Sequence, residues 1–277
     1  MIIPPNQPHD RTITISQTSH SWVSGQLARA WGNEMVARFV PYEQMCYAAE
    51  QHDIGFLEWE SQPTLNVRTG LPYTFEELPE SIHLEIWRRG ISQLMPVCCY
   101  ASLVVSLHFC NLCERFHRNS PDRPEVVHFL KEQSEHQKKA REALGKDQLL
   151  EHAVDSEVLA YHRDLIALWD LLSLELCRGR ATEFKLPNAP VSGAKRVDLL
   201  VHQTDKVKNV WEVDPWPFAV RTLTTFCEGR VFRQRFTDTE QMQLALSNAD
   251  RVTVQFTFQP ADSYRLRGSS PCSDPFL

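Results

Sequence analysis

Glycine is scarce in this chain, with 10 residues among 277. None of them stands in a G-x-G-x-x-G or G-x-x-x-x-G-K pattern, in which glycine lets backbone amides approach phosphate groups. The sequence therefore excludes a Rossmann dinucleotide site and a P-loop.

An excess of basic residues and long apolar runs are also lacking. The chain has 29 basic and 35 acidic residues, so no general surplus of cations can replace counterions along a nucleic acid. No apolar run approaches the roughly 18 residues that a membrane span requires, and the first residues carry no basic leader. We expect a cytoplasmic protein that binds neither nucleic acid nor membrane.

The eight cysteines lie in apolar segments without a secretion signal, which is typical of reduced, buried side chains. Cys110 and Cys113 form a C-x-x-C, but no second C-x-x-C follows and the pair lies inside a helical pattern. We interpret both as core residues, in preference to half a zinc site or a redox pair.

Hydrophobic spacing divides the chain into two parts. Alternation typical of strands runs from about 182 to 260, and a strand-like stretch at 11–16 is expected to pair with these C-terminal strands. Helical spacing predicts helices over 19–33, 42–53, 79–95, 96–117, 124–144 and 148–178.

These patterns predict a mainly α protein with a helical bundle as its larger part. The helical domain, with the N-terminal strand, is expected over 1–180. A small antiparallel β-rich subdomain is expected over 181–260, joined through that strand, and a tail over 261–277.

Four histidines are predicted to point into the core of the helical part. His20, His52, His83 and His108 each lie on an apolar helix face, and Asp170 lies within an apolar run. A buried carboxylate is unfavourable when isolated, and buried imidazoles need partners. A metal ion would satisfy both groups at one point. For any one histidine alone, an ordinary core residue bonded to backbone or carboxylate is the commoner situation.

The order His, His-Asp, His, His, Asp resembles that of the HD-domain superfamily, helical metal enzymes with a His-Asp dyad on their second ligand-bearing helix. Two additional histidines between dyad and late Asp resemble the members that hold two metals. The matching positions are His20, His52, Asp53 and Asp170 for the minimal pattern, and His83 and His108 for the two-metal version.

Longer strings resemble an uncharacterised, mainly bacterial family, domain of unknown function 3891. They lie at 18–32, 52–59, 70–75 and 168–173. That resemblance spans most of the chain and implies no activity of its own, so the function has to be argued from the site.

The superfamily resemblance implies a hydrolase that uses a metal-activated hydroxide on a phosphate ester or nucleotide-like small molecule. The implied cofactor is one or two divalent transition metals, Fe, Mn, Co or Zn. Catalytic work would fall to Asp53, His83 and His108. In the two-metal version His20, His52 and Asp170 hold one metal, His83 and His108 hold the other, and Asp53 bridges them. With a single metal, His83 and His108 become substrate-facing acids or donors.

Two other functions stay open at this point. The same ligand set resembles the di-iron oxygenases of the superfamily, which activate dioxygen to attack a C–H bond. The protein could also be a binding or structural module whose polar core has no catalytic task. A homodimer is compatible with each of these functions.

Several side chains near the predicted site are candidates for contact with an anionic small-molecule substrate: Glu58, Trp59, Arg88 and Arg163. Arginines at such spacing are more often exposed helix surface. Arg230, Arg233 and Arg235 alternate in the β-rich part, where they could share a strand face that binds an anion or a partner, although an exposed face is commoner.

Overall fold

The computed structural model describes residues 1–261, so all but the first position of the predicted tail lies outside the described residues. About 47% of the chain is helical and 22% is strand. The helices are α1 (Gln17–Ala30), α2 (Tyr42–Gln51), α3 (Phe56–Ser61), α4 (Glu80–Leu94), α5 (Cys99–Phe116), α6 (Pro124–Leu144), α7 (Ser156–Arg178) and α8 (Thr239–Ser247), with 3-10 turns η1 (Phe75–Glu77) and η2 (Glu151–Val154). The strands are β1 (Thr12–Ile15), β2 (Leu65–Asn66), β3 (Leu71–Pro72), β4 (Glu183–Ser192), β5 (Lys195–Asp205), β6 (Val210–Asp214), β7 (Leu223–Phe232) and β8 (Asp250–Pro260).

Six strands form one curled, mixed sheet in the order β1-β7-β8-β6-β5-β4, and β2 and β3 form a separate hairpin. Strand β1 pairs antiparallel with β7, so the predicted pairing of the N-terminal strand is confirmed. Strands β6 and β8 are parallel, whereas the other neighbouring pairs are antiparallel. The expected mainly α, or all-α, fold with a small antiparallel subdomain is therefore wrong.

The sheet is large because its inward face supplies one wall of a shared core. Strands β4, β5, β7 and β8 are 10 or 11 residues long, and along β5 buried and exposed residues alternate at its centre. Val201 and Phe258, from two of these strands, belong to the same hydrophobic cluster as Val104 and Leu165, from α5 and α7. Burying that face against the helices makes the sheet a layer of the fold.

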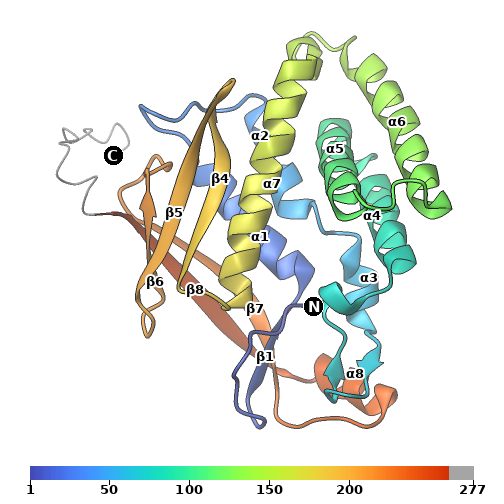
Figure 1. Ribbon diagram of the computed structural model, residues 1–277, viewed down its shortest axis with the longest axis vertical. Helices are drawn as coiled ribbons and strands as arrows, with labels where there is room; N and C mark the ends of the chain where they lie inside the picture. Colours follow the sequence, from blue (N-terminus) through green and yellow to red (C-terminus); the bar gives the residue numbers. More distant parts are fainter. Residues whose placement is uncertain (262–277) are drawn as a thin grey trace.

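The helices form two layers beside the sheet (Figure 1). Helices α1 and α7 lie next to it, with α1 contacting β7 and α7 contacting β4. Helices α4, α5 and α6 lie beyond them, and α5 contacts α2, α4, α6 and α7. The middle of the molecule is consequently where α1, α2, α5 and α7 meet. Among residues 1–261, no helix combines the length and apolar character that crossing a membrane demands.

Candidate metal centre

The His-Asp dyad lies in a tight turn that a glycine allows. Helix α2 ends at Gln51, and His52 and Asp53 precede the start of α3. A Cβ atom added to Gly55 would lie 2.1 Å from the carbonyl oxygen of Ile86 and 2.7 Å from the backbone nitrogen of Gly90. Only glycine lets this turn pack so closely on α4, which fixes the position of the dyad.

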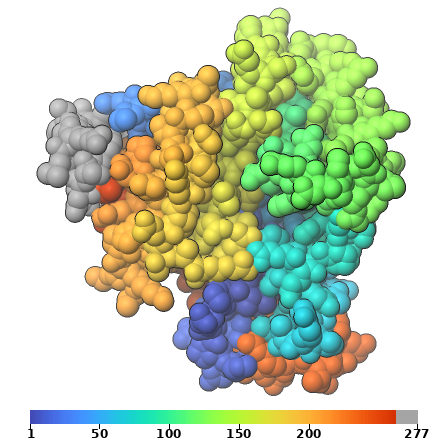
Figure 2. Space-filling model, in the orientation of Figure 1, coloured from blue at the N-terminus to red at the C-terminus, as the bar shows by residue number. Residues whose placement is uncertain are grey.

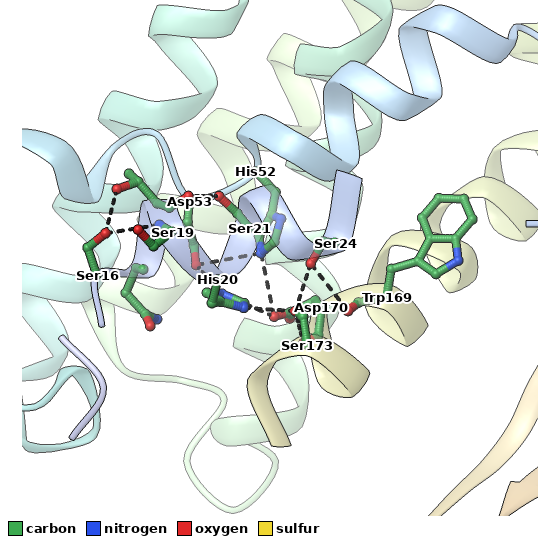
Figure 3. Close-up of polar contacts among 12 residues, drawn as sticks. Ser16, Ser19, His20, Ser21, Ser24, His52, Asp53, Trp169, Asp170 and Ser173 are labelled. Carbon is green, nitrogen blue, oxygen red and sulfur yellow. Dashed lines mark hydrogen bonds and ion pairs between the residues drawn. The ribbon is translucent and has the colours of Figure 1, made fainter. Parts of the chain in front are cut away.

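Hydrogen bonds orient two of the imidazole rings. His52 Nδ1 lies 2.9 Å from the carbonyl oxygen of Ala49, to which only a protonated nitrogen can donate, so Nε2 points away from its own helix. His20, from α1, has Nδ1 2.9 Å from Ser173 Oγ and Nε2 2.9 Å from Asp53 Oδ2 (Figure 3). Backbone and serine oxygens therefore hold the outer nitrogens, while the inner ones face carboxylates.

Asp170, from α7, joins three imidazoles at one point. Its Oδ1 lies 3.7 Å from His20 Nε2 and 3.5 Å from His52 Nε2, and its Oδ2 lies 3.3 Å from His108 Nε2, contributed by α5. His20, His52 and Asp170 each offer a ligand atom within 4.8 Å of the others. Four helices thus bring together five of the six residues that the sequence predicted as metal ligands, a group that we call the His–Asp cluster: His20, His52, Asp53, His108 and Asp170.

The cluster is buried yet incompletely bonded. His20 and His108 are fully buried and His52 is 1% exposed, whereas the Asp170 side chain is 15% accessible. Among residues 1–261, His52 Nε2 and both ring nitrogens of His108 lack a hydrogen-bond partner, although His52 Nε2 and His108 Nε2 lie 3.5 Å and 3.3 Å from Asp170 oxygens. Unbonded buried nitrogens are costly, and a metal ion that accepts their lone pairs removes that cost.

The charges in the cluster are strongly interdependent. Burial opposes protonation of His52, but the carboxylates of Asp53 and Asp170 outweigh it and raise the pKa of His52 to about 9. Burial likewise opposes ionisation of Asp170, but His108 and His52 hold the pKa of Asp170 well below its usual range. Without a metal, a proton on His52 therefore offsets part of the carboxylate charge, and a divalent cation would replace that proton.

His83 lies apart from the other five predicted ligands. It projects from α4 among Phe56, Phe75 and Trp87, with its ring stacked parallel to Trp87 at 5.9 Å between centroids. Burial lowers the pKa of His83, and its Nε2 has no hydrogen-bond partner among the described residues. No ion pair or hydrogen bond joins His83 to the His–Asp cluster in the described part of the chain.

Three of the four predicted substrate residues form ion pairs, and the fourth, Trp59, lines a groove. Glu58 pairs with Arg89 at 3.2 Å, and Glu58 and Trp59 line a groove of about 480 Å³ between α3 and α4. Arg88 pairs with Glu132 of α6 at 2.6 Å, and Arg163 pairs with its neighbour Asp164 at 2.7 Å. Both arginines therefore have carboxylate partners already.

Sequence reasoning did not single out Ser24 and Ser173, which support the cluster. Ser173 Oγ contacts His20 Nδ1, Ser24 Oγ and the carbonyl oxygen of Asp170 (Figure 3). The available signal was their spacing, since Ser24 follows His20 by one helical turn and Ser173 follows Asp170 by nearly one turn.

The family model described as "Protein of unknown function (DUF3891)" matches residues 1–234. The chain belongs to this family. The DUF3891 match includes all five residues of the His–Asp cluster and extends through β7. No curated protein and no solved structure matches the chain.

Proposed function

We propose that the protein is a metal-dependent hydrolase of the HD type, with the His–Asp cluster as its metal centre. The observation that carries this proposal is the pair of buried Nε2 atoms of His52 and His108, which lie 3.5 Å and 3.3 Å from Asp170 and have no hydrogen-bond partner among residues 1–261. The order His, His-Asp, His, Asp along the chain gives further support, since it resembles the ligand order of the HD-domain superfamily.

The donor set fits a divalent transition metal. Imidazole nitrogens and carboxylate oxygens suit Fe, Mn, Co and Zn. A metal bound there would lower the pKa of a bound water toward neutrality and polarise a phosphoryl oxygen. We infer an anionic small-molecule substrate, a phosphate ester, because such a centre attracts and orients phosphate oxygens.

The protein's own residues would divide the remaining tasks. Ser173 and the Ala49 carbonyl orient the imidazoles of His20 and His52, as the outer hydrogen bonds of metal-bound histidines do. Asp53, whose Oδ2 lies 2.9 Å from His20 Nε2, would be a further ligand of that metal. Asp170 has the most accessible side chain of the acidic pair, so substrate would approach from its side.

The test combines metal analysis with a phosphatase assay. The purified protein is analysed for bound transition metals and then assayed with p-nitrophenyl phosphate and its diester in the presence of Mn²⁺ or Co²⁺. Metal-dependent phosphate release that His52→Ala abolishes supports the proposal. His128→Ala is the control, because His128 is exposed and pairs with Glu132 at the surface of α6. Bound iron with substrate-dependent oxygen uptake would instead indicate the oxygenase.

A further inference from the structure

Three arginines near the end of β7 differ in their partners. Arg230 donates through Nη1 to the carbonyl oxygen of Leu246 at 2.9 Å, and Arg233 pairs with Asp250 at 2.5 Å. Arg235 makes neither a hydrogen bond nor an ion pair with any of residues 1–261. Its Nη1 is nevertheless buried. A guanidinium stays charged at every physiological pH. Burying one of its nitrogens without a hydrogen-bond partner is therefore energetically unfavourable.

Arg235 lines a cavity of about 270 Å³. The N-terminal residues 3–7 and Thr12 form one wall, and Thr69, Leu71 and Pro72 of the β2–β3 hairpin form another. Figure 2 shows the N-terminal segment (dark blue), the hairpin region (cyan) and the chain that follows β7 (orange) adjoining at the lower end of the molecule. The walls are mainly uncharged, with hydroxyl and amide groups beside proline rings.

Backbone packing holds Arg235 in this position. The backbone N–H of Phe236 donates to the carbonyl oxygen of Gly70 at 2.9 Å. Gly70 has φ +68, and a Cβ atom added to it would lie 2.7 Å from Arg235 Cβ. Phe236 is buried in a small core with Leu65 and Leu71 of the hairpin. The guanidinium is thus carried by a fixed junction of two segments.

The one acidic residue lining the cavity is already engaged. Glu77 Oε1 accepts from Asn66 Nδ2 at 2.9 Å, and Glu77 Oε2 accepts from the backbone N–H of Thr74 at 2.8 Å and from its hydroxyl at 3.0 Å. Glu77 and Arg235 form no ion pair with each other within the described residues. The guanidinium of Arg235 is therefore available to pair with an anionic ligand in the cavity.

We propose that this cavity is a binding site for a small oxyanion, a molecule bearing a carboxylate or a phosphate group, with Arg235 as its anchor. The planar guanidinium offers parallel N–H donors that match either group. The cavity volume of about 270 Å³ suits a small ligand. The site is separate from the His–Asp cluster and does not depend on the function proposed for it.

Calorimetric titration of the metal-free protein with inorganic phosphate and, separately, with malonate tests this site. We expect millimolar or tighter binding of one of them, weakened at least about tenfold in Arg235→Gln. The anion that binds identifies the group recognised. Arg233→Gln is the matched control, since Arg233 lies two residues away on the surface and should bind like the wild type.

Arg235→Lys keeps the charge without the planar fork, and we expect it to bind more weakly than the wild type while folding normally by circular dichroism. It replaces Arg235→Gln in the comparison should that variant unfold. The proposal is overturned if the wild-type protein binds neither anion, or if the folded Arg235 variant binds as tightly as Arg233→Gln.

Discussion

Two buried histidines between helices α5 and α7 stand in opposite situations. His162 Nδ1 lies 2.6 Å from the hydroxyl of Tyr100, which also lies 3.0 Å from the Ala153 carbonyl oxygen. Eight residues further along each helix, about 12 Å away, His108 faces Asp170, and neither of its ring nitrogens is hydrogen-bonded to any residue in the described part of the chain. The same pair of helices therefore holds one imidazole with a hydrogen-bond partner, His162, and one without such a partner among residues 1–261, His108.

The difference shows that burial of a histidine does not by itself indicate a functional site. Burial alone lowers the pKa of His162 to about 4, so His162 is neutral, and the Tyr100 hydroxyl is a hydrogen-bond partner for its Nδ1. At the His–Asp cluster, carboxylates reverse the effect of burial and raise the pKa of His52 to about 9. Unused ring nitrogens beside carboxylates are what distinguish a candidate metal centre from a core histidine.

The largest expected effect is the loss of bound metal in His52→Ala. Removing this imidazole deletes a ligand from the centre, so metal content per chain should fall from near stoichiometric to near zero. His162→Gln, which alters the satisfied histidine, should keep its metal. Elemental analysis of the two purified variants measures both. Equal metal content in the two would remove the distinction drawn between the sites.

Asp170→Asn tests the charge balance of the cluster in metal-free protein. It leaves His52 and His108 without their shared carboxylate, and breaking such a buried pair lowers the free energy of unfolding by about 3–5 kcal/mol. Asp164→Asn on the same helix breaks partly exposed pairs with Arg163 and Arg196 and should cost at most about 1 kcal/mol. Urea unfolding at neutral pH measures the unfolding free energy of both variants. Equal losses in the two would contradict the larger stabilising role assigned to the Asp170 carboxylate.

Helical periodicity accounts for what the sequence could predict of the cluster. Spacing places a side chain on an apolar face, and for His20, His52, His108 and Asp170 the apolar faces turn toward one another in the structure. The same reasoning put His83 with them. Its helix face meets Phe56 and Phe75 instead, because periodicity defines a face but not the partner that covers it.

The sheet shows a similar limit. Alternation along the chain predicted strands between 182 and 260 and the pairing of the N-terminal strand, but it carries no information on strand order. After β6 the backbone runs along the end of α1, where Gly32 donates its N–H to the carbonyl oxygen of Pro217 and Trp31 bridges to Phe218. Strand β8 lies between β7 and β6, where it pairs antiparallel with β7 and parallel with β6. Tertiary packing, and not local alternation, decides this order and direction of the strands.

Acidification should lower the free energy of unfolding through protonation of His162. The pKa of His162 is about 4 in the folded protein and 6.5 in its ordinary state, so the unfolded chain binds this proton first. Neutral His162 makes its full contribution to the free energy of unfolding above pH 6.5. As the pH falls toward 4 this contribution is lost, and the total loss is about 3 kcal/mol. His162→Phe should flatten this part of the pH profile of unfolding free energy, whereas parallel profiles would show that His162 is not kept neutral by burial.

The smallest expected effect is that of Tyr100→Phe. Its hydroxyl bonds both His162 and the Ala153 carbonyl, and removing it while leaving these groups buried should lower the unfolding free energy by about 1–2 kcal/mol. Metal content should not change, because no hydrogen bond or ion pair links Tyr100 to the His–Asp cluster within residues 1–261. Urea unfolding and elemental analysis of the same sample give both values. Loss of metal in Tyr100→Phe would mean that α5 transmits the change along its length, and the two histidine environments would then be parts of one polar network.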